Sequence, residues 1–340
     1  MADNQNNIHW IALDAMGGDF APSEIVKGAV IAASRGVHTI LVGDEAQIKS
    51  ELGDSTGEHL RIVHAPEKIE MTDSPVRAMK SKPNNSLSKA FELARDKEAS
   101  AVLSAGNSGA LLVGAKWVLG DIPGIFRPAI ATPLPTPIGE AVLLDAGVST
   151  DCSPENLFQF AIMGHFYVKN VLKRENPRIA LLNIGEEKSK GNVTVQKVYE
   201  FLSNSNLNFV GNIEGDEIFG GSADVIVCDG FVGNIVLKVA EGTGRAIFNM
   251  FRQNVSKGGL MGKLGSMMIR DSMKSIKKKM DWREYGGALI MGVKGNVIIT
   301  HGKSKAQSIA NALCYADSLA KTDLAEMISR EITSNANMAS

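Results

Sequence analysis

The stretch "IALDAMGGDFAPSEIVKGAV", residues 11–30, joins an apolar strand to a helix through a glycine-rich turn. Its apolar run ends at Asp14, and the turn then supplies Gly17, Gly18 and Asp19. In an open α/β sheet, ligands bind outside the carboxyl ends of the strands. We therefore expect this turn to form part of the floor of a binding site.

Similar apolar runs rich in Val, Ile and Leu recur along the chain, with helical patterns between them. They are "IHWIALDA", "HTILVGD", "LRIVHA", "SAVLSAG", "AVLLDAG", "RIALLNIG", "LNFVGNI", "ADVIVCDG" and "GNVIITHG". Near-continuous apolar strands that alternate with helices are typical of βαβ units around a mostly parallel sheet. The pattern predicts an α/β fold. With no internal repeat or low-complexity linker, we expect residues 1–340 to form a single α/β domain.

Five of these runs end in loops of Gly, Asp, Asn and Ser. The loops are 14–19, 104–109, 145–147, 183–185 and 229–230. Because the carboxyl ends of parallel strands share one edge of a sheet, we expect all five loops to line one cleft. The proline-rich stretch "RPAIATPLPTP", residues 127–137, predicts an edge strand or a hairpin, since proline is excluded from central ladders.

Composition and charge exclude several classes of protein. A formal net charge of -1 over 340 residues argues against a generally basic protein that coats nucleic acid. The three cysteines, Cys152, Cys228 and Cys314, are too widely spaced for a disulfide framework or a zinc ribbon, and no cluster of metal ligands stands out. The chain shows neither a secretory signal pattern nor a long apolar run, so we expect a cytoplasmic location.

Glycine-rich turns followed by a helix start are candidate anion sites. In "SAGNSGALLVGAKWV", Ser104, Gly106, Asn107 and Ser108 would place free backbone N–H groups and a helix dipole at one point, which suits phosphate. The alternative is an ordinary helix N-cap with glycines for tight packing. Neither a nucleotide-binding loop nor a hydrolase nucleophile elbow is complete in the chain.

Two further strand-to-helix turns carry polar candidates. "NIGEEKSKGN" places Asn183 and Lys190 in one loop, where a lysine could neutralise phosphate or a developing oxyanion, or simply be solvated. "VIVCDGFVGN" places Asp229 and Asn234 around a turn, where they could contact an acyl oxygen or only cap the helix. His301, at the end of the last strand, has the best position of the six histidines for acid/base work.

A basic, methionine-rich segment covers about residues 245–283, with ten basic and two acidic side chains. Its apolar residues fall at helical spacing with lysines between them, which predicts a helical projection that contacts a membrane surface, an acidic partner or a second subunit. The candidate contact residues are Leu260, Leu264, Met267, Met268, Lys274, Lys277, Lys278 and Lys279.

Several motifs together resemble one known family. "DAMGGD", "SAGNSGA", "LLNIGEEKSKGN", "NFVGNIEGDEIF", "ADVIVCDGFVGNIVLK" and "YGGALIMGVKGNVIITHG" are similar, in order and spacing, to the bacterial phosphate acyltransferases of phospholipid synthesis. The likeness runs from about Ile8 to Asn311. The chain departs from the usual pattern at Gly147-Val148-Ser149, at Ser74 and at Lys303, which affects the polar contacts of those loops.

The resemblance implies transfer of a fatty acyl group from acyl carrier protein to inorganic phosphate. The acyl phosphate would then serve a membrane-bound glycerol-3-phosphate acyltransferase in phosphatidic acid and phospholipid synthesis. It also implies a Rossmann-like three-layer α/β/α sandwich with a projecting helical arm, a homodimer, peripheral association with the inner face of the membrane, and no cofactor. The alternatives are an acyl-CoA/phosphate acyltransferase of the phosphotransacetylase type and a membrane-docked scaffold without activity.

On this basis we expect phosphate to bind at the Gly106-Asn107-Ser108 turn and to attack the thioester directly, without a covalent enzyme intermediate. Lys190 and Asn234 are the catalytic candidates for charge stabilisation. The substrate-binding candidates are Asp14, Gly17, Gly18, Asp19, Ser104, Gly106, Asn107, Ser108, Asn183, Asp229 and His301. Since bare carboxylates would repel phosphate, we expect Asp14 and Asp19 to orient backbone donors or a lysine.

Overall fold

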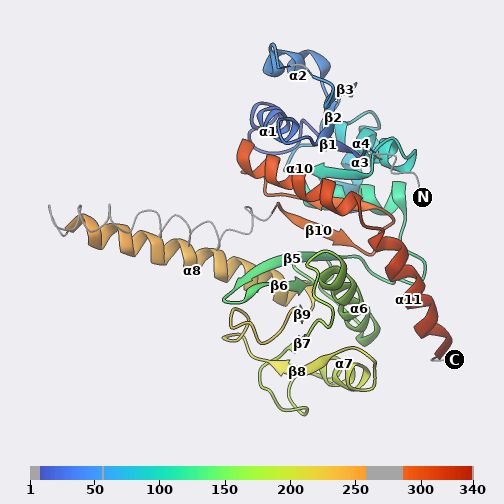
Figure 1. Ribbon diagram of the computed structural model, residues 1–340, viewed down its shortest axis with the longest axis vertical. Helices are drawn as coiled ribbons and strands as arrows, with labels where there is room; N and C mark the ends of the chain where they lie inside the picture. The colour runs from blue at the N-terminus through green and yellow to red at the C-terminus, as the bar shows by residue number, and fades with distance from the viewer. Residues whose placement is uncertain (1–7, 56, 258–285, 339–340) are drawn as a thin grey trace, which may run out of the picture.

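The computed structural model describes residues 8–55, 57–257 and 286–338 (Figure 1). Its strands are β1 Trp10–Asp14, β2 His38–Gly43, β3 Leu60–His64, β4 Ala101–Ser104, β5 Ala129–Thr136, β6 Gly139–Leu144, β7 Ile179–Leu182, β8 Phe209–Ile213, β9 Val225–Val227, β10 Ala288–Met291 and β11 Asn296–Ile299. Its α-helices are α1 Ser23–Ala33, α2 Glu45–Leu52, α3 Pro75–Ser81, α4 Ser86–Arg95, α5 Ser108–Gly114, α6 Pro154–Asn170, α7 Val193–Ser203, α8 Gly230–Lys257, α10 Ala306–Ala320 and α11 Leu324–Met338. A π-helical turn, η1 Ala115–Leu119, continues α5.

In the described part of the chain, eleven strands form one sheet in the order β3-β2-β1-β4-β11-β10-β5-β6-β9-β7-β8. All nine predicted strands are present, and β5 and β10 join them. Most neighbouring strands are parallel, which confirms the predicted α/β class. Three successive pairings, β11 with β10, β10 with β5 and β5 with β6, are antiparallel. The strands from β6 to β8 therefore run opposite to β1, β2, β3 and β4.

The proline-rich strand β5 lies inside the sheet, so the expectation of an edge strand is wrong for the strand as a whole. Its first residues, 129–131, pair with β10, whereas residues 132–136 pair with β6. Pro133 and Pro135 thus fall in the half of β5 that pairs with β6 and has no ladder with β10. The missing N–H groups of the two prolines are tolerated in this half of β5, because its edge on the β10 side has no hydrogen-bond ladder to complete. The predicted hairpin is confirmed by the β5–β6 pairing.

Side chains of alternate strand residues pack against two helical layers, one on each face of the sheet. Ile11 and Leu13 of β1 face the cluster that contains α1 and α10, whereas Ala12 faces α4 and α5. In the β6–β8 half, α6 and α7 cover the first of these faces, and the beginning of α8 packs on the other through Val236 and Leu237. This period-two alternation with both faces buried gives a three-layer α/β/α sandwich.

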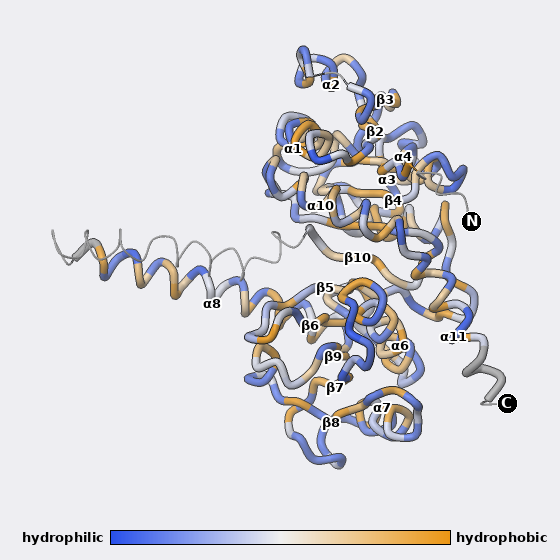
Figure 2. The backbone as a smooth tube through the Cα atoms, in the orientation of Figure 1, coloured by the Kyte–Doolittle hydropathy of each residue, from blue (hydrophilic) through white to orange (hydrophobic). Residues whose placement is uncertain are grey.

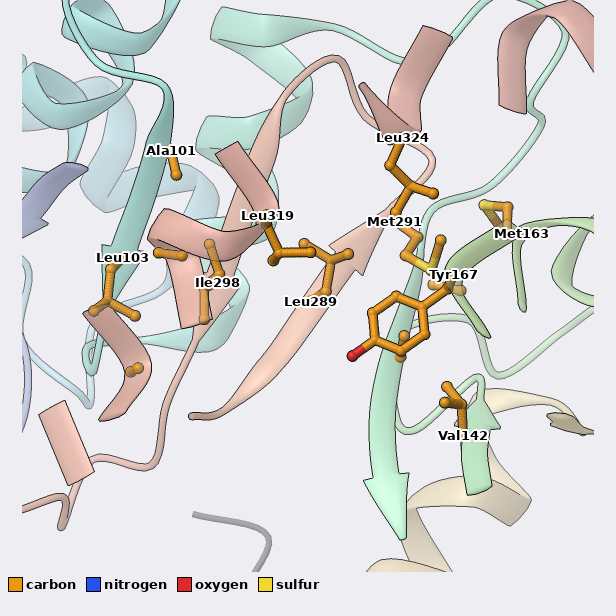
Figure 3. Packing of buried hydrophobic residues seen from close by; sticks show 14 of the residues in the cluster. Ala101, Leu103, Val142, Met163, Tyr167, Leu289, Met291, Ile298, Leu319 and Leu324 are labelled. Atoms are coloured by element: carbon orange, nitrogen blue, oxygen red, sulfur yellow. The ribbon is translucent and has the colours of Figure 1, made fainter. Parts of the chain in front are cut away.

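One core runs through both halves of the sheet (Figure 3). Leu289 and Met291 of β10 lie between Leu103 on one side and Val142 on the other, and all are buried. The hydroxyls of Tyr167 in α6 and Tyr315 in α10 are 2.7 Å apart and tie the helices of the two halves together. The opposed half-sheets therefore share one continuous apolar interior.

Helix α8 extends away from the sheet as an arm (Figure 1). Apolar and polar residues alternate along it (Figure 2), and Phe231, Ile235, Val239 and Met250 are among its exposed side chains. The helix begins at Gly230, so the arm starts earlier in the chain than the predicted segment of about 245–283. The eight predicted contact residues from Leu260 to Lys279 lie outside the described residues.

Candidate functional site

The glycine-rich turn after β1 lies at a change of strand order. From β1 the chain builds β2 and β3 to one side, and β4 then pairs with the other side of β1. Such a switch point leaves a crevice between the loops that follow the two central strands. We call residues 14–19, 104–109 and 301–304 the first loop cluster, because backbone or side-chain contacts join all three loops.

Asp14 is the buried centre of this cluster. Its carboxylate accepts hydrogen bonds from the hydroxyls of Ser86 at 2.6 Å and Ser104 at 2.7 Å, and from the N–H of Met16 at 3.2 Å. Burial raises the pKa of Asp14 above 3.8, while the hydrogen bonds oppose that rise. Ser104 in turn accepts from the N–H of Gly106 at 2.9 Å. Asp14 thus orients the N–H of Met16, as expected of a donor-orienting aspartate, and through Ser104 it also links the two glycine turns.

Glycine is required at two positions of the cluster, because neighbouring backbone and side-chain atoms leave no room for a Cβ or because the backbone adopts a positive φ. A Cβ at Gly17 would overlap Asp14 Oδ2 and lie 2.9 Å from the Gly106 nitrogen. Gly18 has φ +110°, a conformation that L side chains rarely adopt. The next N–H, of Asp19, donates to the carbonyl of Gly302 at 2.7 Å. These contacts bring the loops after β1, β4 and β11 together.

Asn107 has a structural role in this arrangement. Its side-chain oxygen accepts from the N–H of Ala110 and caps α5, as the alternative interpretation predicts. Its amide nitrogen donates to the carbonyls of Met71 at 3.2 Å and Asp73 at 3.0 Å. The donors left at this helix start are backbone N–H groups of Ser108 and Gly109, for which no acceptor is found among the described residues.

The turn after β11 adds His301 and a lysine to the cluster. The N–H of Lys303 donates to His301 Nδ1 at 3.0 Å, so the neutral ring carries its proton on Nε2. The hydroxyls of Thr300 and Ser304, both buried, are 2.8 Å apart and hold the turn. Lys303 itself is exposed and brings a positive charge to the edge of the first loop cluster.

A cavity of about 500 Å³ adjoins the first loop cluster. One wall is the turn after β1, with Met16, Gly18 and Asp19, and Gln47 of α2 closes one side. The opposite wall is the segment 68–72, which follows β3 and which we call the strap. None of the sequence patterns singled out the strap.

The second loop cluster comprises residues 145–149, 183–191 and 229–234, which follow β6, β7 and β9. Asp145 is fully buried and accepts four backbone N–H groups, from Ile130, Gly147, Val148 and Ser149, at 2.6–3.1 Å. Burial raises its pKa, and the four donors oppose that rise. Asp145 lies in one of the five predicted loops but is not among the predicted site residues, although its position after "VLL" matches that of Asp14 after "IAL".

The turn after β9 packs tightly on the Asp145 loop. A Cβ at Gly230 would lie 2.6 Å from Asp145 Oδ2, and the N–H of Gly230 donates to Ser149. Asp229 accepts from the N–H of Val232 at 2.8 Å and so caps α8. Asn234 is exposed on the first turn of that helix, beside Gly147.

The loop after β7 presents Lys190. Asn183 organises this loop: it accepts from the N–H of Ile184 at 2.8 Å and donates to the carbonyl of Lys190 at 3.2 Å. The Lys190 ammonium is about half exposed and lies 4.0 Å from a carboxylate oxygen of Glu187, at the limit of an ion pair. The lysine is therefore available to an incoming anion.

The expectation that five loops line one cleft is wrong. The first and second loop clusters follow strands that run in opposite directions, because three antiparallel pairings separate β4 from β6. Four inter-strand steps of roughly 4.8 Å place these two strands ~19 Å apart. The structure brings together Asp14, Asp19, Ser104, Gly106 and His301, and separately groups Asn183, Lys190, Asp229 and Asn234.

The cysteines of the second half are poor nucleophiles. Burial raises the pKa of the Cys152 thiol to about 12, with smaller contributions from nearby carboxylates. Burial also raises the pKa of Cys228 well above its ordinary value. Over the described residues, no group of three His, Cys, Asp or Glu side chains is arranged to hold a metal ion. None of the described helices has both the length and the apolar composition of a bilayer span.

Comparison with known proteins identifies close relatives. The family described as "Fatty acid synthesis protein" matches residues 10–327. A phosphate acyltransferase from Pelotomaculum thermopropionicum is 48% identical over 326 residues, which cover 95% of this chain and 95% of that protein. A phosphate acyltransferase from Aquifex aeolicus is 45% identical, over 92% of this chain and 94% of the relative.

Solved structures share the fold at lower identity. A phosphotransacetylase from Streptococcus pyogenes superposes with a TM-score of 0.61 at 17% identity, covering 92% of this chain and 94% of that one. A phosphotransacetylase from Staphylococcus aureus gives a TM-score of 0.62 at 15% identity, with the same coverage. These likenesses establish a common α/β architecture.

Proposed function

Because this chain belongs to the bacterial phosphate acyltransferase family, we propose that it transfers a fatty acyl group from the thioester of acyl carrier protein to inorganic phosphate. The chain is thus an acyltransferase, and the scaffold alternative is set aside. The observation that carries the proposal is the first loop cluster, where buried Asp14 holds two glycine turns beside free N–H groups at a sheet switch point.

Phosphate would bind against the N–H groups of Ser108 and Gly109, with Lys303 supplying positive charge nearby. Backbone donors at a helix start suit an anion because they carry partial positive charge and are already fixed in place. The side chain of Asn107 would keep the turn in shape rather than touch phosphate, since both ends of its amide have protein partners.

A phosphate oxygen would attack the thioester carbonyl carbon directly. The tetrahedral oxyanion then collapses, the carbon–sulfur bond breaks, and the proton of hydrogen phosphate passes to the leaving thiolate. The products are acyl phosphate and the free thiol of the carrier. Phosphate is a competent nucleophile, so the protein mainly positions it and stabilises charge. The high pKa of Cys152 supports a route without a cysteine acyl intermediate.

His301 is our candidate to stabilise the leaving group: its Nδ1 accepts from the N–H of Lys303, so its Nε2–H would donate a hydrogen bond to the thiolate while the proton of hydrogen phosphate passes to the sulfur directly. Lys190 and Asn234 remain candidates for stabilising the oxyanion. For that role the second loop cluster, which follows strands of opposite direction, must reach the acyl carbon through closure of the halves or from a second copy. Activity of Lys190 variants therefore reports whether the second cluster takes part.

We further propose that the acyl phosphate supplies phospholipid synthesis and that the enzyme works as a single-domain subunit of a homodimer at the inner face of the membrane. The exposed apolar stripe of α8, with Phe231, Ile235 and Val239, supports contact of the arm with a second subunit or a lipid surface. A membrane-bound glycerol-3-phosphate acyltransferase would then receive the product.

The test is acyl phosphate formation by the purified protein with phosphate and palmitoyl acyl carrier protein. Parallel reactions use palmitoyl-CoA as donor and omit phosphate. Product from the carrier-protein donor alone supports the proposal, whereas product from CoA alone favours an enzyme of the phosphotransacetylase type. Absence of product from both donors contradicts the proposed function.

A further inference from the structure

The cavity between the turn after β1 and the strap is held in shape by hydrogen bonds and an ion pair. The strap is held at both ends: Lys82 Nζ donates to the carbonyl of Lys68 at 3.0 Å, and Asn107 donates to the carbonyl of Met71 at 3.2 Å. The N–H of Glu70 donates to Asp73 at 2.9 Å, and Lys82 pairs with the same carboxylate at 2.6 Å. Five residues of chain are thus fixed over the carboxyl ends of neighbouring strands.

The lining of this cavity argues against a phosphate dianion as its occupant. Lys68 and Glu70 form an ion pair with 2.9 Å between nitrogen and oxygen, so their charges cancel. Asp19 then leaves a net negative charge on the walls. An anion would be repelled here. Inorganic phosphate is better served by the backbone donors beyond Gly18.

The lining also argues against a fatty acyl tail. Met16, Ile69 and Met71 give apolar contact, but Gln47, Thr72 and the charged groups interrupt it. A long hydrocarbon prefers an unbroken apolar wall, because each polar group that it covers loses water without gaining a hydrogen bond. A neutral chain that carries amides spaced by methylenes would match both kinds of wall.

We propose that this cavity binds the pantetheine arm of the acyl donor. The inference rests on the proposed function and names the part of the donor that the first loop cluster receives. Pantetheine is neutral, contains two amides, and is of the size that a cavity of about 300–1,000 Å³ encloses. Gly18 belongs both to the cavity wall and to the first loop cluster, so an arm under the strap would end with its thioester beside the phosphate donors.

The experiment fills the cavity from its edge. Gln47 is exposed on α2, so Gln47→Trp introduces bulk without disturbing the core. Ala46→Trp is the matched control, since Ala46 is exposed on the same helix and does not line the cavity. Each variant is assayed with palmitoyl acyl carrier protein, with palmitoyl-CoA, and with palmitoyl-N-acetylcysteamine, which lacks most of the arm.

We expect Gln47→Trp to raise the KM for palmitoyl acyl carrier protein by about tenfold, because binding energy remote from the reacting bond is lost; palmitoyl-CoA is compared in the same way if the wild type uses it. The KM for phosphate and the rate with the truncated donor should stay near wild type, which also shows that the variant is folded. A rise for the carrier-protein donor but not for CoA would locate the arm of that donor alone.

Equal donor KM values in Gln47→Trp, Ala46→Trp and the wild type would overturn the inference and leave the proposed function intact. An equal loss with full-length and truncated donors would also overturn it, because the cavity would then act on the acyl group or on the fold. Wild-type protein that forms no acyl phosphate would instead contradict the proposed function.

Discussion

The carboxylate of Asp14 accepts hydrogen bonds from Ser86, Ser104 and Met16, and we call this set of contacts the Asp14 knot. The substitution Gly17→Ala tests whether the Asp14 knot sets the geometry of the first loop cluster. The added methyl would overlap Asp14 Oδ2 and approach both the Gly106 nitrogen and the Ser104 hydroxyl at 2.9 Å. None of these atoms can move freely. The carboxylate of Asp14 accepts hydrogen bonds from the hydroxyls of Ser86 at 2.6 Å and Ser104 at 2.7 Å, and the N–H of Gly106 donates to the Ser104 hydroxyl.

The magnitude follows from these contacts. Forcing a methyl into a tightly packed site costs about 1–3 kcal/mol, and weakening one hydrogen bond to a buried carboxylate costs about 1–3 kcal/mol more. A total of ~3 kcal/mol, divided by an unfolding entropy of ~0.7 kcal/mol/K for a chain of this length, lowers the Tm by ~4 °C. Displacing the glycine turns by several tenths of an ångström should also lower kcat/KM for acyl phosphate formation, by up to ~100-fold.

The assay combines thermal unfolding with initial rates of acyl phosphate formation. Gly215→Ala is the matched control, because a Cβ there meets no atom within 4 Å. The control should unfold and react like the wild type. If Gly17→Ala also matched the wild type in both measurements, the Asp14 knot would not constrain the site, and the reasoning would fail.

Three further outcomes are expected. Burial raises the pKa of Asp14 in the folded protein, so ionising this carboxyl costs more in the folded than in the unfolded state. The free energy of unfolding of the wild type, relative to that of Asp14→Asn, should therefore fall as the pH rises above 3.8. Unfolding curves over a pH series measure this difference, and a difference that does not change with pH would contradict the prediction. Lys190→Ala should reduce turnover by roughly 100-fold if its charge stabilises the oxyanion, with Lys188→Ala in the same loop as control, and equal rates in the two variants would remove Lys190 from the mechanism. Cys152→Ser should keep its activity, since a thiol with a pKa of about 12 is protonated at neutral pH; loss of acyl transfer without loss of folding would contradict direct attack by phosphate.

The sequence did not indicate β10, and for β5 it predicted the hairpin but not a place inside the sheet; in both cases neighbouring strands decide the outcome. β10 is four residues long and lies between two antiparallel partners, where a short apolar run has no period that distinguishes it. β5 contains Pro133 and Pro135, which argue against a strand inside a sheet. It forms one because its two halves pair with different strands, and that exchange of partners is a property of the whole sheet.

Within the site, local chemistry was predictable where residues act on their own turn. Gly17, Gly18 and Asp14 mark a close-approach turn by their type and spacing, and Asn107 and Asp229 cap the helices that follow them. The strap at 68–72 was missed because its residues form no motif. Hydrogen bonds from Lys82 and Asn107, which lie 14 and 36 residues further along the chain than their partners, help to hold it as a cavity wall.

The sequence by itself determined the α/β class, the positions of nine strands, the polar turns at their ends and the family, because each depends on the order of residues within a short segment or on a set of such segments in series. Only the tertiary structure decided which turns meet. The direction of each half-sheet depends on three antiparallel pairings between segments far apart in the chain, and those pairings place Ser108 and Lys190 in separate clusters. Pairing partners are chosen by the packing of the whole core, so no single stretch of the chain encodes them.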